Sequence, residues 1–413
     1  MLGVIADDFT GASDIASFLV ENGLRTVQMN GVPTQPLQDS VDAIVISLKS
    51  RSNPANEAVQ QSLQALDWLK QNGCSQFYFK YCSTFDSTEK GNIGPVTDAL
   101  LKALNDDFTV ITPALPINGR TIFNGYLFVG DVLLNESGMR NHPITPMKDA
   151  NLLRLMDSQA EGKTGLVAYA DVIQGSEQVK ARFAALKQQG CRYAVVDAVD
   201  NQQLAVLADA VADFKLVTGG SGLAAYMAAR LSGGKKGDNA FTPTKGKTVV
   251  LSGSCSVMTN QQVENYQKKA PHLFLEVEQA INHPDYADRL YQWTMENLDS
   301  PLAPMIYATV PPEKLKAIQN EFGAERASQA IEQTFARLAE KLKNAGVTNF
   351  ITAGGETSSI VVQQLGFSGF HIGKQIAPGV PWLKAVEEPI YLALKSGNFG
   401  KVDFFEFAQG MAV

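Results

Sequence analysis

The first twenty residues of the chain constrain its fold more than any other stretch. An apolar run over residues 2–5 stops at Asp7 and Asp8, and apolar residues then recur at helical spacing over residues 12–19. This pattern predicts a buried strand, a short polar loop and a helix, with Thr10 as the candidate N-cap residue. Because α/β proteins bind ligands where a strand ends and a helix begins, the polar loop is the first candidate for a binding site.

Strand and helix patterns alternate along much of the rest of the chain. The alternation is most regular between residues 165 and 231, where three strand runs each lead into a helix. Units of this length predict a parallel sheet with helices on both faces. Asn-Gly turn signals flank residues 121–123 and 126–129, and this spacing predicts a β-hairpin outside the main sheet. The expected fold class is therefore α/β with largely parallel sheets.

A chain of 413 residues is too long for one ordinary core and predicts two or three domains. Residues 232–247 are rich in Gly, Lys, Thr and Pro and have no apolar period, so they are the best linker candidate. We expect one domain over residues 1–232 and a second over residues 247–413, which begins with a new strand pattern.

Charge and composition exclude several classes of function. The formal net charge is −7, which gives no general attraction for nucleic acid. Four scattered cysteines without CxxC spacing argue against a zinc site or a disulfide framework, and the sequence indicates no membrane span. A strand pattern that starts at residue 2 leaves no room for a signal peptide, so we expect a cytoplasmic protein. A homo-oligomer is compatible with this composition.

The paired acids Asp7 and Asp8 have two interpretations. The start of a helix favours negative charge, so Asp8 and Asp14 could serve only to stabilise the helix end. One capping residue explains one acid and leaves the other unexplained. We therefore expect Asp7, Asp8 and Thr10 to belong to a ligand site.

Cations and hydroxyl groups follow the next two strand patterns. Lys49 and Arg51 come after the strand run at 42–48, beside a helix start, which suits a bound anion. Lys80 lies at the end of the strand run at 77–81 and begins a hydroxyl-rich segment that contains Asp86 and Lys90. Carboxylates accept hydrogen bonds from sugar hydroxyls and lysines donate to a carboxylate, so this mixture suits a sugar acid. A solvated polar loop remains the alternative for both segments.

Arg120 lies on the predicted hairpin turn, where it can serve the same site or be a surface charge.

Three glycine-rich turns follow strand patterns in the second half of the chain, at residues 252–256, 353–358 and 396–400. Small residues let the backbone approach a ligand closely, and exposed N–H groups suit phosphate oxygens. The chain has neither GxxxxGK[ST] nor a GxGxxG followed by an acid, so a nucleotide site here would be of another type. A further glycine turn at 219–222 resembles a phosphate loop, although any tight strand-to-helix turn needs glycine.

The motifs ADDFTGA, STEKGNIG, SGSCS, TAGGETS, IAPGVP and KSGNFG occur in this order along nearly the whole chain. Together they resemble the four-carbon acid sugar kinase family, and the similarity is closest to its 3-oxo-tetronate kinase branch. The resemblance implies an N-terminal domain that binds a sugar acid and a C-terminal domain that binds ATP. It also implies that the active site lies in the cleft between them and that phosphate passes to the terminal hydroxyl.

Carried over by motif, the resemblance implies a set of nucleotide-binding positions. One position departs from the family pattern, because Lys90 stands where members often have arginine, and this exchanges a bidentate fork for a point charge. The orientation of the bound carboxylate depends on that exchange. The implied nucleotide positions are Ser252, Ser254, Gly354, Gly355, Glu356, Thr357, Gly397 and Asn398.

Phosphoryl transfer needs positioning, charge stabilisation and a carboxylate that accepts the alcohol proton. Our hypothesis assigns that carboxylate to Asp8 or, second, to Asp86, with ATP and Mg²⁺ held at the glycine turns and the metal ligands unassigned. The sequence leaves the particular four-carbon acid and its epimer open. The alternatives are a sugar-acid isomerase or hydrolase that uses no nucleotide, and a two-lobed sugar-acid binding protein.

Overall fold

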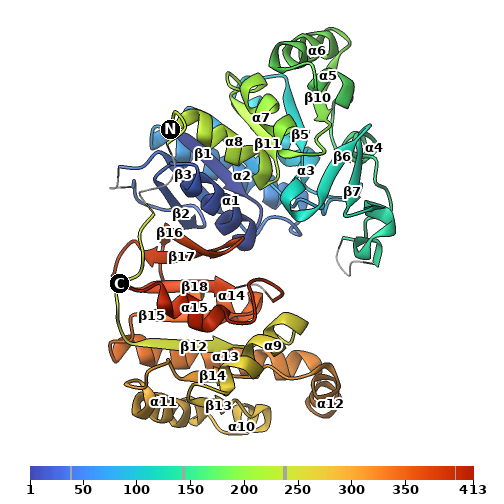
Figure 1. Ribbon diagram of the computed structural model, residues 1–413. Helices are drawn as coiled ribbons and strands as arrows, with labels where there is room; N and C mark the ends of the chain where they lie inside the picture. Colours follow the sequence, from blue (N-terminus) through green and yellow to red (C-terminus); the bar gives the residue numbers. More distant parts are fainter. Residues whose placement is uncertain (38–39, 142–144, 236–239, 396) are drawn as a thin grey trace. The chain divides into compact units, whose positions relative to one another are not determined.

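The computed structural model describes residues 1–413 except 38–39, 142–144, 236–239 and 396. It divides the chain into two compact units, residues 1–239 and residues 240–413. Each unit is an α/β structure with helices packed against a sheet (Figure 1), which confirms the predicted fold class. Part of the predicted linker and Ser396 of the third glycine turn lie outside the described residues.

The sheet of the N-terminal unit is parallel. Its strands lie in the order β2-β3-β1-β4-β11-β5-β10-β9, and each described pair of neighbours is parallel. All five residues of β1 are buried, as the apolar run at the start of the chain predicts. The strands are β1 (Leu2–Ala6), β2 (Thr26–Asn30), β3 (Ala43–Ser47), β4 (Gln76–Lys80), β5 (Thr109–Thr112), β9 (Lys163–Val167), β10 (Cys191–Val196) and β11 (Leu216–Gly219).

Helices of the N-terminal unit connect these strands and pack against the sheet and one another, as α1 does against α8. The helical spacing of Ile15, Ala16 and Leu19 gives α1 a fully buried face. Short 3₁₀ helices cover residues 116–118, 134–136 and 138–141. The α-helices are α1 (Phe9–Glu21), α2 (Ala55–Gln71), α3 (Ile93–Ala103), α4 (Leu152–Asp157), α5 (Tyr169–Val172), α6 (Ser176–Gln188), α7 (Asn201–Ala210) and α8 (Ser221–Leu231).

Helix α1 begins two residues earlier than the sequence pattern predicts. Its N-cap residue is Asp8, whose carboxylate accepts a hydrogen bond from the backbone N–H of Gly11 at 2.8 Å. The prediction that Thr10 is the N-cap was therefore wrong, and Thr10 lies exposed in the first turn. Aspartate is at least as good an N-cap as threonine, and it is the first residue that can reach the free N–H groups.

The predicted hairpin is present as a small antiparallel sheet of β6 (Arg120–Phe123), β7 (Tyr126–Val129) and β8 (Val132–Leu133). Asn124 and Gly125 form its turn with φ values of 51° and 74°, as an Asn-Gly hairpin turn requires. The buried carboxylate of Asp197 accepts hydrogen bonds from the backbone of both turn residues at 2.8 and 2.9 Å. This contact ties the hairpin to the loop after β10.

The glycine turn at 219–222 is explained by close packing of two backbone segments. A Cβ atom at Gly219 would lie 2.5 Å from the carbonyl oxygen of Thr112, and one at Gly222 would lie 2.5 Å from that of Ala114. Such distances exclude any side chain at these positions. The glycines therefore have a structural reason here that needs no bound phosphate.

The sheet of the C-terminal unit has the strand order β13-β14-β12-β15-β18-β17-β16. The pairs from β13 to β18 are parallel, whereas β17 pairs antiparallel with both β18 and β16. The strands are β12 (Thr248–Ser252), β13 (His272–Phe274), β14 (Met305–Tyr307), β15 (Asn349–Ala353), β16 (Gly369–Ala377), β17 (Val380–Ala385) and β18 (Tyr391–Lys395). The helices are α9 (Val257–Gln267), α10 (Val277–Asn282), α11 (Tyr286–Asn297), α12 (Pro312–Phe322), α13 (Ala324–Asn344), α14 (Gly355–Leu365) and α15 (Phe404–Gly410).

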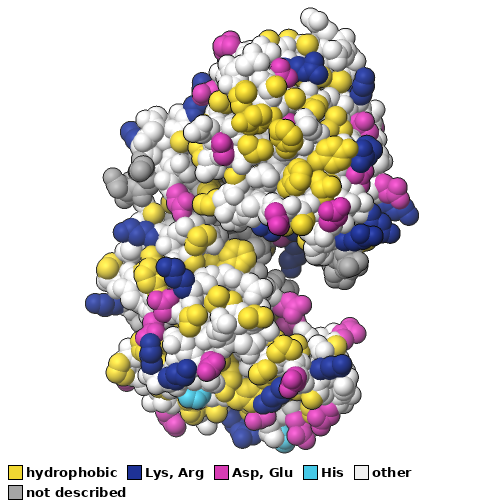
Figure 2. Space-filling model, turned by 45° about the vertical axis from the view of Figure 1, so that its right-hand side comes forward, with side chains coloured by type: hydrophobic (Ala, Val, Ile, Leu, Met, Phe, Trp, Pro, Cys, Tyr) yellow, Lys and Arg dark blue, Asp and Glu magenta, His cyan; other side chains and the backbone are white. Residues whose placement is uncertain are grey.

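Charged side chains are distributed over the surface. On the face drawn in Figure 2, acidic and basic side chains are interspersed over both units. This mixture agrees with the modest net charge of −7. In the part of the chain that the structure describes, no helix combines the length and the apolar character needed to cross a bilayer.

Candidate active site

The carboxyl ends of three neighbouring strands define a polar site in the N-terminal unit. β1 lies between β3 and β4, and Ala6 at its end is in register with Ser47 and Lys80. The loops that follow these strands therefore leave the sheet side by side. This arrangement brings together candidate residues that are up to about eighty positions apart in the sequence.

Arg51 is the centre of this polar site. Its guanidinium group makes a bidentate pair with Asp7, with Nε–Oδ2 and Nη2–Oδ1 distances of 2.9 and 2.8 Å. Nη2 also lies 2.9 Å from a carboxylate oxygen of Asp8, and Nη1 lies 3.7 Å from one of Asp86. We call Arg51 and these three aspartates the acid cluster. In the structure the guanidinium of Arg51 faces these protein carboxylates, and its side chain remains 23% exposed.

The three acids of the cluster differ in their access to solvent. The side chain of Asp8 is 31% exposed, compared with 7% for Asp7 and 9% for Asp86. Asp8 is also fixed by its capping bond to Gly11, where any side chain would overlap a carboxylate oxygen of Asp8. Asp8 is therefore the member of the cluster that a ligand can reach, and its position is set by the start of α1.

Asp86 occupies its position through an unusual backbone conformation. Both Phe85 and Asp86 have positive φ values, 64° and 33°, which non-glycine residues rarely adopt. The hydroxyl of Thr84 donates a 2.7 Å hydrogen bond to the Asp86 carboxylate, and the ring of Phe85 is buried. Strain of this kind is typical of functional loops, where the surroundings hold the chain in place.

Lys80 lies beside the first turn of α1, where a Cβ atom at Gly11 would be 3.2 Å from its Nζ. Its side chain is buried, and Nζ donates a 2.7 Å hydrogen bond to the carbonyl oxygen of Tyr81. Burial raises the pKa of Asp14, and the charge of Lys80 opposes that rise. The hydroxyl of Ser221 donates to Asp14, so this acid joins α1 to α8. The sequence interpretation gave Asp14 only a helix-end role and did not foresee this contact.

Asn92 is a positioning residue that the sequence interpretation quoted but did not assign. Its side-chain amide donates to the carbonyl oxygens of Ser50, Arg51 and Asn53 at 2.8, 3.2 and 2.8 Å. These bonds hold the loop that carries Arg51 against the loop after β4. The asparagine of the STEKGN motif was the available signal in the sequence, but residue spacing does not show which groups it binds.

The other candidate residues of the N-terminal unit are not part of the acid cluster. Lys49 and Lys90 are exposed, and Thr10 is exposed on α1. Arg120 lies on β6, and its side chain donates to the carbonyl oxygen of Asn118. Among the described residues, no ion pair or hydrogen bond links these four side chains to the cluster.

The three glycine turns of the C-terminal unit come together. A Cβ atom at Gly397 would lie 3.0 Å from Cβ of Ser256, and one at Gly354 would lie 3.1 Å from the backbone nitrogen of Ser254. Gly354 also has a φ value of 125°, which a residue with a side chain adopts only under strain. The turns therefore touch one another, and glycine is required where they do.

A cavity of about 470 Å³ opens at two of these turns, the one after β12 and the one after β15. One end is lined by Gly253, Ser254, Cys255 and residues 354–357, and the rest is lined largely by apolar side chains of α10, α12 and α13. A polar end made of backbone and an apolar wall match the usual construction of a small-ligand site, and the volume is in the usual range.

The helix α14 starts at the polar end of this cavity. Its N-cap is Gly354, which offers no side chain, so no side-chain cap bonds the first-turn N–H groups. A Cβ atom at Gly355 would meet nothing within 4 Å, so the space in front of the helix is open. Free N–H groups at a helix start attract anions such as phosphate. Glu356 is the exposed carboxylate in the same turn.

The hydroxyl and amide side chains predicted to bind nucleotide differ in whether they face the cavity. Ser252 is buried, and its hydroxyl is 2.7 Å from that of Thr309, directed into the unit rather than toward the cavity. Ser254 lines the cavity. The side-chain oxygen of exposed Asn398 accepts a 3.4 Å hydrogen bond from the backbone of Met258 at the start of α9.

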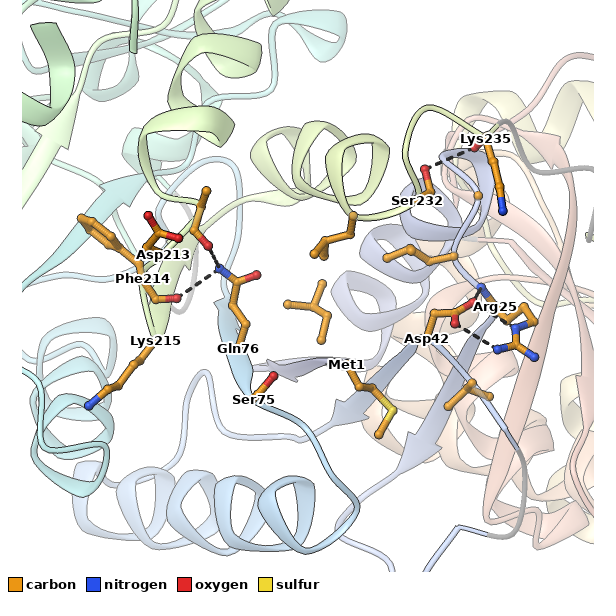
Figure 3. Close-up of a pocket in the computed structure, with 16 residues that line it drawn as sticks. Met1, Arg25, Asp42, Ser75, Gln76, Asp213, Phe214, Lys215, Ser232 and Lys235 are labelled. Carbon is orange, nitrogen blue, oxygen red and sulfur yellow. Dashed lines mark hydrogen bonds and ion pairs between the residues drawn. The ribbon is translucent and has the colours of Figure 1, made fainter. Parts of the chain in front are cut away.

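A second cavity of about 870 Å³ lies at the opposite ends of the strands in the N-terminal unit (Figure 3). Several of its polar groups are paired within the protein. The amide of Gln76 donates to the carbonyl oxygens of Ala212 and Phe214, and Arg25 makes a bidentate pair with Asp42. We therefore assign no catalytic role to this cavity.

Comparison with known proteins agrees with this division into two sites. A family model for a sugar-binding N-terminal domain matches residues 2–227, and one for a nucleotide-binding C-terminal domain matches residues 249–405. A protein of Actinobacillus succinogenes named 3-oxo-tetronate kinase is 82% identical over 413 residues, which is 100% of both chains. A protein of Haemophilus influenzae with the same name is 81% identical over 411 residues, again 100% of both chains.

Solved structures show the same fold. That of a Haemophilus influenzae protein covers 100% of both chains at 80% identity with a TM-score of 0.93. A structure from Salmonella typhimurium, described as a putative tRNA synthase, covers 99% of this chain and 98% of its own at 55% identity, with a TM-score of 0.95.

The matched sugar-binding and nucleotide-binding domains, together with relatives named as kinases, define the class of protein as a carbohydrate kinase. The chain belongs to the four-carbon acid sugar kinase family, in the branch whose curated members are named 3-oxo-tetronate kinase. The family resemblance and the predicted enzyme class, a phosphotransferase with an alcohol group as acceptor, are thereby confirmed.

Proposed function

We propose that the protein transfers the γ-phosphate of ATP to the terminal (4-) hydroxyl of 3-oxo-tetronate, forming the 4-phosphate in sugar-acid catabolism. The observation that carries the proposal is the cavity lined by two glycine turns, which ends at an uncapped helix start and whose turn after β12 is contacted by the third glycine turn. The shared name of relatives that are 82% and 81% identical supports the choice of acceptor. In this proposal residues 1–232 bind the sugar acid and residues 247–413 bind the nucleotide.

The nucleotide would bind with its phosphates over the glycine turns and its base against the apolar wall. The backbone of Gly354, Gly355, Thr357 and Gly397 would meet the phosphates. Magnesium in nucleotide sites takes phosphate oxygens plus one or two carboxylates, and Glu356 supplies a carboxylate at the phosphate end of the cavity. Bound Mg²⁺ would neutralise charge on the phosphates. Ser252, Ser254 and Asn398 would shape the turns.

The sugar acid would bind over the acid cluster. Carboxylates suit its hydroxyl groups, and a carboxylate ligand needs cations, for which Lys80 and the exposed Lys49 and Lys90 are candidates. Thr10 and Arg120 complete the proposed set. Because Arg51 is paired with Asp7, its contribution would be to hold the acids in place.

In the transfer step the terminal hydroxyl oxygen forms a bond to the γ-phosphorus while the bond from that phosphorus to ADP breaks. The hydroxyl proton passes to a carboxylate, which we assign to Asp8 because it is the accessible acid of the cluster, with Asp86 as the second candidate. Phosphoryl transfer asks the protein mainly for alignment and charge stabilisation, so a firmly held carboxylate suits it.

A coupled assay of ADP release tests the proposal over a panel of four-carbon acids, with erythronate, threonate and their 3-oxo forms as acceptors. We expect ADP release that needs ATP, Mg²⁺ and an acid together, fastest with a 3-oxo form. Conversion of the acid without ATP would instead support an isomerase or hydrolase. Tight binding of the acid with no ADP release would support a binding protein.

A further inference from the structure

Helix α12 is the wall of the proposed nucleotide cavity that is least attached to the rest of its unit. None of its residues is buried, whereas each of the other α-helices described within residues 240–413 has at least one buried residue. It packs against α13 and lies at the edge of the C-terminal unit (Figure 1). Segments with few buried contacts are the parts of a protein that open most easily.

Two cavities flank α12. Leu315 and Ile318 line the cavity of about 470 Å³ at the glycine turns. Lys314 lines a separate cavity of about 700 Å³, together with Pro311 and Pro312 at the start of the helix. Close packing is what normally holds a helix in one position, so a helix with open space beside it can shift without displacing packed side chains.

The joint between α12 and α13 is a single glycine. Gly323 ends α12 and is the N-cap of α13, and its φ value is 82°. A Cβ atom at Gly323 would meet nothing within 4 Å, so the space beside the joint is open. Glycine adopts positive and negative φ values with similar ease, so the direction of α12 relative to α13 can change here at low cost. Residues at the ends of elements commonly serve as hinges in this way.

The side chains that α12 presents to the cavity suit one part of a nucleotide. Leu315 and Ile318 are three positions apart, on one face of the helix, and both are partly exposed. A four-carbon acid is hydroxylated and charged and gains little from an apolar wall, whereas the flat rings of a base gain by leaving water. The rest of the apolar lining comes from Val277, Ala308, Val310, Ala327 and Ile331.

We propose that α12 is a lid that closes on a bound nucleotide, with Leu315 and Ile318 packing against its base. The proposal rests on the proposed nucleotide site and changes one fixed wall of that site into a moving one. The phosphates are held at the polar end of the cavity, so the base is the part of the ligand left to face α12. Closure covers the two partly exposed side chains and excludes water from the base, as substrate-induced lids do.

Hydrogen exchange of the full-length protein, followed by mass spectrometry, measures the closure. The ligand is Mg²⁺ with adenylyl imidodiphosphate, which is not hydrolysed like ATP, at about one hundred times its Kd. The α12 amides should then exchange at least about tenfold more slowly, because opening of the helix requires release of the ligand. The amides of α11, which lines neither cavity, are the reference and should slow by a smaller factor. Inorganic tripolyphosphate has no base and should leave α12 unchanged.

Two double variants separate the base contact from the stability of the helix. Leu315→Ala with Ile318→Ala keeps good helix formers but removes both apolar side chains. In isothermal titration calorimetry it should bind the nucleotide about tenfold more weakly. At saturation it should lose the protection of α12 and keep that of the first turn of α14. Lys316→Ala with Asn320→Ala, at exposed positions of α12 that line neither cavity, is the control and should behave like the wild type.

Each result decides the inference. Nucleotide that binds the wild type without slowing exchange in α12 overturns it, even if the variant at Leu315 and Ile318 does not fold. Equal slowing by tripolyphosphate overturns the base contact, and so does a folded variant with wild-type affinity. If the wild type binds no nucleotide at all, the proposed function itself fails, and that outcome is distinct from binding without closure.

Discussion

Replacing Arg51 by methionine should destabilise the N-terminal unit strongly, because it leaves the buried carboxyl group of Asp7 without its ion-pair partner. The Asp7 side chain is 7% exposed and receives two hydrogen bonds of 2.8 and 2.9 Å from Arg51. Breaking a buried ion pair by removing one partner costs about 3–5 kcal/mol, and since Arg51 is 23% exposed we expect the lower end, about 3 kcal/mol. For a unit of 239 residues this corresponds to about 6–12 °C in the unfolding midpoint.

Thermal unfolding of the full chain, combined with hydrogen exchange at the β1 amides to localise the effect, measures this loss. The double variant Arg51→Met with Asp7→Asn should recover most of the lost stability, because the buried carboxyl group that lacks a partner is removed. The matched control is Arg25→Met. Arg25 makes the same bidentate contact with Asp42 at 3.0 Å, but on the surface, where such pairs contribute little. If the control loses as much stability as Arg51→Met, or if the double variant recovers nothing, burial of the pair is not the cause.

Three further predictions concern single side chains. Asp8→Asn should keep the α1 cap, since asparagine caps helices as well as aspartate, yet lower kcat by about a hundredfold or more at unchanged KM for ATP; near-normal kcat would reject Asp8 as the proton acceptor. Ser252→Ala should leave the KM for ATP within about twofold and cost about 1 kcal/mol of stability, because its hydroxyl bonds Thr309; a large KM increase in steady-state kinetics would contradict this. Burial lowers the pKa of Lys395 to about 7 in the folded protein, against about 10.4 in an unfolded chain, so the unfolded state binds more protons between these values. Lys395 should therefore contribute a rise with pH across this window, so that in urea titrations the free energy of unfolding of the wild type, relative to that of Lys395→Met, increases with pH.

The sequence predicts the backbone framework well because that framework follows local rules. The apolar runs that became β1, β3 and β4, and the Asn-Gly hairpin turn, depend on patterns within a few residues. The wrong N-cap prediction for α1 also concerns only a few residues. Asp8 and Thr10 are both good N-cap residues, and the backbone conformation between them decides which one caps the helix.

The polar contacts could not be predicted because they join distant segments. Arg51 meets Asp7 across 44 positions, and its orientation toward the acids rather than outward depends on strand register and on the loop held by Asn92. Lys395 lies in a motif that was quoted for its glycines, and nothing in the motif indicates that the lysine is buried. Its burial follows from how α9 and the three turns pack around the end of β18.

The unfavourable backbone of Phe85 and Asp86 has a consequence for how this protein can change. Conformations of this kind cost about 1–3 kcal/mol per residue, so something else must hold the loop. Phe85 is held by an edge-to-face contact with the buried ring of Tyr81, at a centroid distance of 5.7 Å, and Tyr81 contacts Phe79 in the same way. The position of the Asp86 carboxylate thus depends on edge-to-face contacts among aromatic rings that are not proposed to take part in catalysis. A substitution among those rings could alter turnover while every polar residue of the site stays intact.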